Sequence, residues 1–80
     1  MNKELTSLQK SIVKIMISTN KDWSAVELSQ RGIETTLGGI GSSIKALVKF
    51  GITEQTRRAI GKKSAKYRLT QKGIKIAKEL

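Results

Sequence analysis

The stretch GSSIKALVKFGI, residues 41–52, decides the fold, because its apolar and basic residues separate onto two sides of a helix. Ile44, Leu47 and Val48 have the spacing of core residues. At about 100° per residue, Ser42, Lys45 and Lys49 fall on the opposite side. We expect the apolar side to pack against the rest of the chain and the small, basic side to face an external partner.

Signals at both ends bound this helix. Thr35 or Thr36 can cap its first turn, because a threonine side chain accepts a hydrogen bond from a free backbone amide there. Gly51 fits the left-handed conformation that follows many helices, which glycine adopts without a steric penalty.

A first helix is expected over residues 5–19, where apolar residues recur at helical spacing. Thr6 and Gln9 have the spacing of a capping box, and a start nearer Asn2 is equally consistent with the sequence. NKDW, residues 20–23, is typical of a turn, and we expect Trp23 to anchor the core.

Ser24 and Glu27 form a second capping box, in the sequence S-A-V-E, which predicts a short helix through about Gln30. Only about four residues, RGIE or GIET, connect this helix to the next one. Such a short connection is typical of a helix-turn-helix motif, in which the second helix of the pair enters the DNA major groove.

The sequence after Gly51 predicts a β-hairpin. ITEQTRR (52–58) and AKYRLT (65–70) have the composition of strands, and AIGKKS (59–64) contains the turn. Tyr67 and Leu69 are expected on one face of the second strand, with basic residues on the other.

A short final helix is expected over residues 71–80, QKGIKIAKEL. Ile74 and Ala77 are expected to point inward, with Leu80 as a further inward candidate. Gly73 is expected to weaken the first turn, because glycine has a low helix propensity.

The net charge of +10 is concentrated in the second half of the chain. Residues 1–44 carry five basic and four acidic groups, whereas residues 45–80 carry eleven basic and two acidic groups. This imbalance indicates a polyanionic partner, and a lysine-rich solubilising surface is the alternative interpretation.

Missing residue types argue against several classes of protein. The chain has no cysteine and no histidine, which removes disulfides, the commonest general base and the commonest zinc ligands. Its six carboxylates show no obvious pairing, so we expect no enzyme, no metal and no cofactor. Apolar runs are too short for a membrane span and the N-terminus has no signal-like stretch, so we expect a soluble, cytoplasmic, nucleoid-associated protein.

Three stretches carry a resemblance to a known class: WSAVELSQRGIE (23–34), IGSSIKALVKFGITEQ (40–55) and KYRLTQKGIKIAKEL (66–80). With them the chain resembles small archaeal and bacterial winged helix-turn-helix transcriptional regulators of the MarR/PadR type. The resemblance implies an α+β, mostly α fold over residues 1–80, as a single domain. It has a three-helix core, a two-stranded basic wing and a short C-terminal helix.

This resemblance also implies binding to duplex DNA, with the third helix in the major groove and the wing on phosphates or the minor groove. We expect base reading to be modest, because the outer face of the third helix offers no arginine, asparagine or glutamine. The residues expected to contact DNA are Thr35, Thr36, Gly38, Gly39, Ser42, Ser43, Lys45, Lys49, Arg57, Arg58, Lys62, Lys63, Lys66 and Arg68.

Members of this class typically act as homodimers. Val13 and Ile17 lie outside the main apolar stripe of the first helix, so either the C-terminal segment or a second subunit must cover them. We take Val13, Ile17, Ile76 and Leu80 as the candidate dimer surface. No small-molecule ligand is expected, because the chain lacks the ligand-pocket segment of larger members.

Two other interpretations remain open from the sequence. The chain could be a winged-helix module that binds protein or RNA within a larger assembly. It could also serve plasmid or viral replication, or partition, with the same DNA-binding domain. The operator sequence and the sign of regulation do not follow from the residues.

Overall fold

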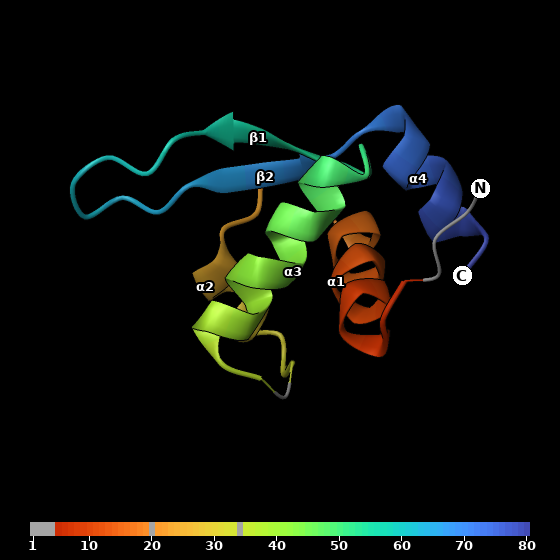
Figure 1. Ribbon diagram of the computed structural model, residues 1–80, viewed down its shortest axis with the longest axis horizontal. Helices are drawn as coiled ribbons and strands as arrows, with labels where there is room; N and C mark the ends of the chain where they lie inside the picture. Colours follow the sequence, from red (N-terminus) through yellow and green to blue (C-terminus); the bar gives the residue numbers. More distant parts are fainter. Residues whose placement is uncertain (1–4, 20, 34) are drawn as a thin grey trace.

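A computed structural model describes residues 5–19, 21–33 and 35–80. The elements follow in the order α1 (Ser7–Ser18), α2 (Ala25–Ser29), α3 (Leu37–Lys49), β1 (Thr53–Arg57), β2 (Lys66–Leu69) and α4 (Gln71–Lys78) (Figure 1). This order confirms the expected α+β, mostly α fold with a two-stranded wing. The alternative helix start at Asn2, the turn residue Asn20 and the connection residue Glu34 lie outside the described residues.

Each helix begins at a hydroxyl side chain that accepts a hydrogen bond from the third backbone amide of the helix. The caps are Thr6, Ser24, Thr36 and Thr70. Both predicted capping boxes are confirmed, and Thr36 is the cap of α3. Hydroxyl caps satisfy amides that would otherwise lack a partner, which fixes where each helix starts.

The end of α3 is set by Gly51, as expected, with a φ of 77°. Its amide donates to the carbonyl of Val48 at 3.0 Å, and the next amide, of Ile52, donates to the carbonyl of Leu47 at 2.9 Å. This pair of bonds is a Schellman motif, with Leu47 and Ile52 both buried. The motif turns the chain directly from the third helix into the first strand of the wing.

A single apolar cluster lies between α1, α3 and the elements around them. Its buried members are Ile12, Val13, Met16, Trp23, Leu28, Ile40, Ile44, Leu47, Ile52 and Ala77. The expected inward face of α3 is therefore confirmed, as is the role of Trp23 in the core, where only 1% of its surface is exposed.

Val13 corrects one sequence-based expectation. We placed it on a spare apolar flank available to a second subunit, but it is 0% exposed within the single chain. Helix α4 packs against α1, and Ala77 of α4 belongs to the same core cluster as Val13. The C-terminal segment, rather than a partner, therefore covers this side of α1.

Strands β1 and β2 pair antiparallel from Thr53 opposite Leu69 to Arg57 opposite Lys66, with a bulge between Gln55 and Arg57. Trp23 adds a bridge to the free edge of β2: it exchanges two backbone hydrogen bonds of 2.7 Å with Tyr67. The segment expected to be a simple turn thus also fastens the wing to the helices. Figure 1 shows the free end of the hairpin projecting past α2 and α3.

Gly73 also has a packing role that the sequence did not predict. A Cβ at this position would lie 2.0 Å from the carbonyl oxygen of Ile52, so only glycine lets α4 approach the start of β1 this closely. The Thr70 hydroxyl stabilises the same contact between α4 and the start of β1, because it donates to the carbonyl of Gly51 at 2.5 Å. Ala77 is buried, whereas Leu80 is 42% exposed and does not point into the core.

Candidate nucleic-acid interface

The outer face of α3 is open to solvent, as the helical periodicity predicts. Ser42, Lys45 and Lys49 are exposed, and Ser43 is half-buried. Because Ile40, Ile44 and Leu47 are buried on the opposite face, the helix is fixed in rotation and this small, basic surface cannot turn inward.

Glycines flatten the first half of this face. Gly38 is exposed and Gly39 half-buried, between the exposed Thr35 and Thr36 and the rest of the helix. A Cβ at Gly41 would meet no atom within 4 Å, and one at Gly38 would meet only the Thr36 hydroxyl at 3.8 Å. Packing within the chain therefore does not require glycine at 38 or 41, whereas an external surface that approaches the backbone closely would benefit from it.

The tip of the wing is a closed turn that carries an exposed apolar residue. Ile60 and Lys63 exchange backbone hydrogen bonds of 3.0 and 2.9 Å, and Gly61 between them has a φ of 57°. Ile60 is 68% exposed, the largest exposure among the described large apolar residues that lie on the surface. Sequence reasoning did not single it out, although it is the only large apolar residue in the basic run 57–64.

The six basic residues of the wing divide into two groups. Three make contacts near the wing: Arg57 Nη2 donates to the Ser64 carbonyl at 2.7 Å, Arg68 Nε to Glu54 Oε1 at 2.5 Å, and Lys66 Nζ lies 3.3 Å from Glu27 Oε1. The other three, Arg58, Lys62 and Lys63, are exposed, and no ion pair holds them within the described part of the chain. These three are therefore the cations of the wing that are most available to an anionic partner.

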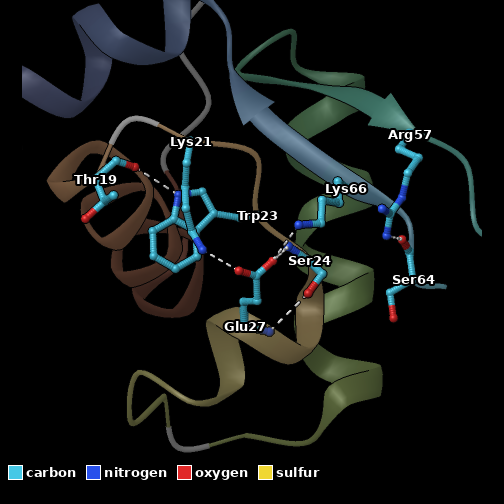
Figure 2. Close-up of polar contacts among 8 residues, drawn as sticks. All are labelled: Thr19, Lys21, Trp23, Ser24, Glu27, Arg57, Ser64 and Lys66. Atoms are coloured by element: carbon cyan, nitrogen blue, oxygen red, sulfur yellow. Dashed lines mark hydrogen bonds and ion pairs between the residues drawn. The ribbon is translucent and has the colours of Figure 1, made fainter.

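Glu27 forms a network that the sequence analysis recognised only in part. Its carboxylate accepts from the Ser24 amide at 3.1 Å, as a capping box requires, but it also pairs with Lys21 and Lys66 (Figure 2). The pKa of Glu27 is lowered from 4.5 to about 2, mainly by the hydrogen bond from Lys21. Hydrogen bonds from the Ser24 amide and Lys66 also lower the pKa, whereas partial burial raises it. Sequence spacing revealed the cap but not the pairing with Lys66, because that contact depends on how the wing folds back.

Lys21 and Arg31 both lie over the ring of Trp23, with Lys21 Nζ 4.6 Å and Arg31 Cζ 5.0 Å from its centre. The indole nitrogen donates to the Thr19 carbonyl at 3.0 Å (Figure 2). These contacts hold Trp23 between the end of α1 and the start of α2, which keeps the backbone bridge to β2 in place.

The other candidate dimer residues differ in how much they offer a partner. Ile17 and Ile76 are half-buried and pack against the core cluster, whereas Leu80 is exposed. Val48 corrects a further expectation, because it has core spacing in the sequence but is 38% exposed in the structure. Val26 on α2 is also exposed, at 41%.

Within residues 5–19, 21–33 and 35–80, no three histidine, cysteine, aspartate or glutamate side chains gather as a metal ion would need. The helices of the same residues include none with the length and apolar character needed to cross a membrane.

Three helices around one core, a short connection between the second and third, and a hairpin that follows directly define a winged helix-turn-helix domain. Solved structures share this fold. The chain is similar to ZitR from Lactococcus lactis, described as a zinc-responsive MarR family member, with a TM-score of 0.79, 22% sequence identity and 99% of this chain covered.

Two further solved structures are also similar to the chain. The adhesin competence repressor AdcR from Streptococcus pyogenes matches with a TM-score of 0.79 and 21% identity over 95% of this chain. Reduced MarR from E. coli matches with a TM-score of 0.77 and 23% identity over 92%. The chain spans about half the length of these proteins, 53% of each. At these identities the likeness establishes the fold. No protein-family model and no curated protein sequence matches the chain.

Proposed function

We propose that this chain is a duplex-DNA-binding transcriptional regulator that inserts α3 into the major groove and lays its basic wing along phosphates or the minor groove. The observation that carries the proposal is the outward face of α3, which is small and basic while the opposite face is locked into the core. A helix with this division, followed by a projecting cationic hairpin, suits the width and charge of the major groove and its flanking backbone.

Each candidate contact has a defined chemistry in this arrangement. Lys45 and Lys49 reach phosphates from α3, while the hydroxyls of Ser42 and Ser43 donate to or accept from base edges. Thr35 and Thr36, with the glycines that follow, lie at the helix start, where backbone amides favour a phosphate. The glycines allow the duplex to approach closely.

On the wing, Arg58, Lys62 and Lys63 supply the phosphate contacts. Arg57 has its guanidinium on the Ser64 carbonyl and Arg68 on Glu54, so both contribute charge from positions fixed by the hairpin itself. With few residues capable of bidentate base contacts, sequence preference per site is modest, and much of the affinity comes from counterion release.

A titration of the free protein with labelled duplex at several salt concentrations tests this function. We expect affinity to fall steeply as salt rises, with a slope near −0.9 for each phosphate neutralised. Competition with single-stranded RNA of the same length should displace little duplex. Absence of duplex binding at low salt, together with binding to RNA or to a protein, would instead favour an interaction module.

Selection of bound duplexes from a random pool would define the site. A palindrome with half-sites about one helical turn apart would support binding as a homodimer, which we propose by likeness to the class. Recovery of unrelated sequences without symmetry would contradict a dimeric, sequence-preferring regulator.

A further inference from the structure

The Glu27 side chain lies where the helix-turn-helix meets the wing. Glu27 is the third residue of α2, and Lys66, which it contacts at 3.3 Å, is the first residue of β2. Figure 2 shows Lys21 and Ser24, from the segment before α2, and Lys66, from β2, converging on the one carboxylate. No other described carboxylate has two lysine partners.

Two neighbouring residues of β2 are both bound to residues outside the hairpin, one through its backbone and one through its side chain. Tyr67 is fastened to Trp23 through two backbone hydrogen bonds of 2.7 Å. Lys66, the residue before it, is fastened to Glu27. Because consecutive strand residues point to opposite faces, Tyr67 faces the core while Lys66 reaches across to α2. Rotation of β2 about the Trp23 bridge would pull Lys66 away from the carboxylate.

This ion pair is less exposed than the other pair on the wing. The side chains of Glu27 and Lys66 are 27% and 31% exposed, whereas those of Glu54 and Arg68 are 45% and 58% exposed. Less water around a pair means less screening, so solvent screens the attraction between Glu27 and Lys66 less than the attraction between Glu54 and Arg68.

We propose that Glu27 is a positioning residue that holds Lys66, fixes the wing against the helix-turn-helix and withdraws Lys66 from the cations available to phosphate. The claim that Lys66 is withdrawn from phosphate rests on the proposed DNA-binding function, whereas the claim that Glu27 fixes the wing does not. Lys66 was expected to contact DNA, and this inference gives it a different role.

Glu27→Gln separates the two roles of the carboxylate. A glutamine oxygen still accepts from the Ser24 amide, so the capping box survives while the charge attraction to both Lys21 and Lys66 is lost. Lys66→Met removes the partner, and Lys66→Arg restores a positive charge. Lys62→Met at the tip is the matched control for loss of one wing lysine.

The first test uses the free protein. Lys66→Met should lower the melting temperature by about 3 °C in the wild-type background and by under about 1 °C in the Glu27→Gln background. Lys66→Arg should retain most of the wild-type melting temperature. The amide chemical shifts of residues 57–65 should move in the same direction in Glu27→Gln and in Lys66→Met. The proposed restraint would be overturned if the melting-temperature shifts of the two substitutions simply added in the double variant and if Glu27→Gln left the amide shifts of residues 57–65 unchanged.

The second test uses duplex DNA. Lys62→Met should reduce the magnitude of the salt slope by about 0.9, whereas Lys66→Met should leave it unchanged. An equal reduction by both variants would show that Lys66 contacts phosphate and would overturn its withdrawal. If the wild-type chain binds no duplex at any salt, the proposed function fails, and the melting experiment still decides whether Glu27 restrains the wing.

Discussion

At the scale of single residues, Glu27 links folding to pH. Its pKa lies near 2 in the folded chain, below the ordinary value of 4.5, so the folded state favours the charged carboxylate. The resulting stabilisation is complete above about pH 4.5 and is lost as the pH falls toward 2.

Thermal unfolding of the wild type and Glu27→Gln between pH 7 and pH 2 measures this contribution. We expect the wild type to melt at a higher temperature at pH 7 and the difference to shrink as the pH falls through that window. A difference that stays constant down to pH 2 would contradict the assigned ion pairs, because the protonated carboxyl can no longer pair with Lys21 or Lys66.

Gly73 and Gly41 both lie within helices, but an added Cβ would be blocked at Gly73 and would meet no neighbouring atom at Gly41. Gly73→Ala should destabilise the fold by at least about 2 kcal/mol, since its Cβ would meet the Ile52 carbonyl oxygen at 2.0 Å and backbone must move. Gly41→Ala, which meets nothing within 4 Å, should stabilise it by about 0.5–1 kcal/mol.

Urea denaturation of the two glycine variants provides the comparison. Because both changes add the same methyl group to a helix, propensity alone predicts the same sign for each. Equal stabilisation of both would mean that α4 does not approach β1 as closely as the structure describes.

At the scale of elements, most of the secondary structure could be predicted from helix caps and from the periodicity of apolar residues. The Thr6 and Ser24 boxes and the Gly51 terminus depend on neighbours in the sequence, so local pattern was sufficient to place the three N-terminal helices. The alternating strand with Tyr67 inward was predictable for the same reason.

The sequence was insufficient where a residue depends on a distant element. Val13 is covered by α4, and Gly73 is required by Ile52, neither of which can be recognised from helical spacing. The pairing of Glu27 with Lys66 joins two elements that lie far apart in the sequence. The residues on the outer face of α3 could be predicted, but which wing cations are held by the chain itself could not.

The proposed role of α3 predicts a selective loss of duplex affinity. Lys45→Ala and Lys49→Ala should each weaken binding and reduce the magnitude of the salt slope by about 0.9, because each removes a phosphate contact. Melting temperatures should change little, since both side chains are exposed. Lys10→Ala on α1, also exposed, removes the same charge outside the proposed interface and should leave the slope unchanged. Equal effects of all three variants would indicate attraction to net charge without a defined interface.

At the scale of the whole molecule, the apolar residues left on the surface bear on assembly. Leu80, at the end of the chain beyond α4, is 42% exposed, so Leu80→Asp can test the proposed dimer without disturbing the core. We expect the wild-type chain to sediment as a dimer and this variant to shift toward monomer, with an unchanged melting temperature for the monomer. A dimer that persists would remove Leu80 from the proposed surface. Val26→Asp, at an exposed valine outside that surface, serves as the control.

The central claim is that the outer face of α3 and the cationic wing bind one duplex together. Amide chemical shifts of the labelled protein, followed while duplex DNA is added, test it most directly. We expect the largest shifts on residues 35–49 and 57–64, with the exposed side of α1 and the end of α4 nearly unmoved. Shifts concentrated on α1 and α4, or on the wing without α3, would contradict it.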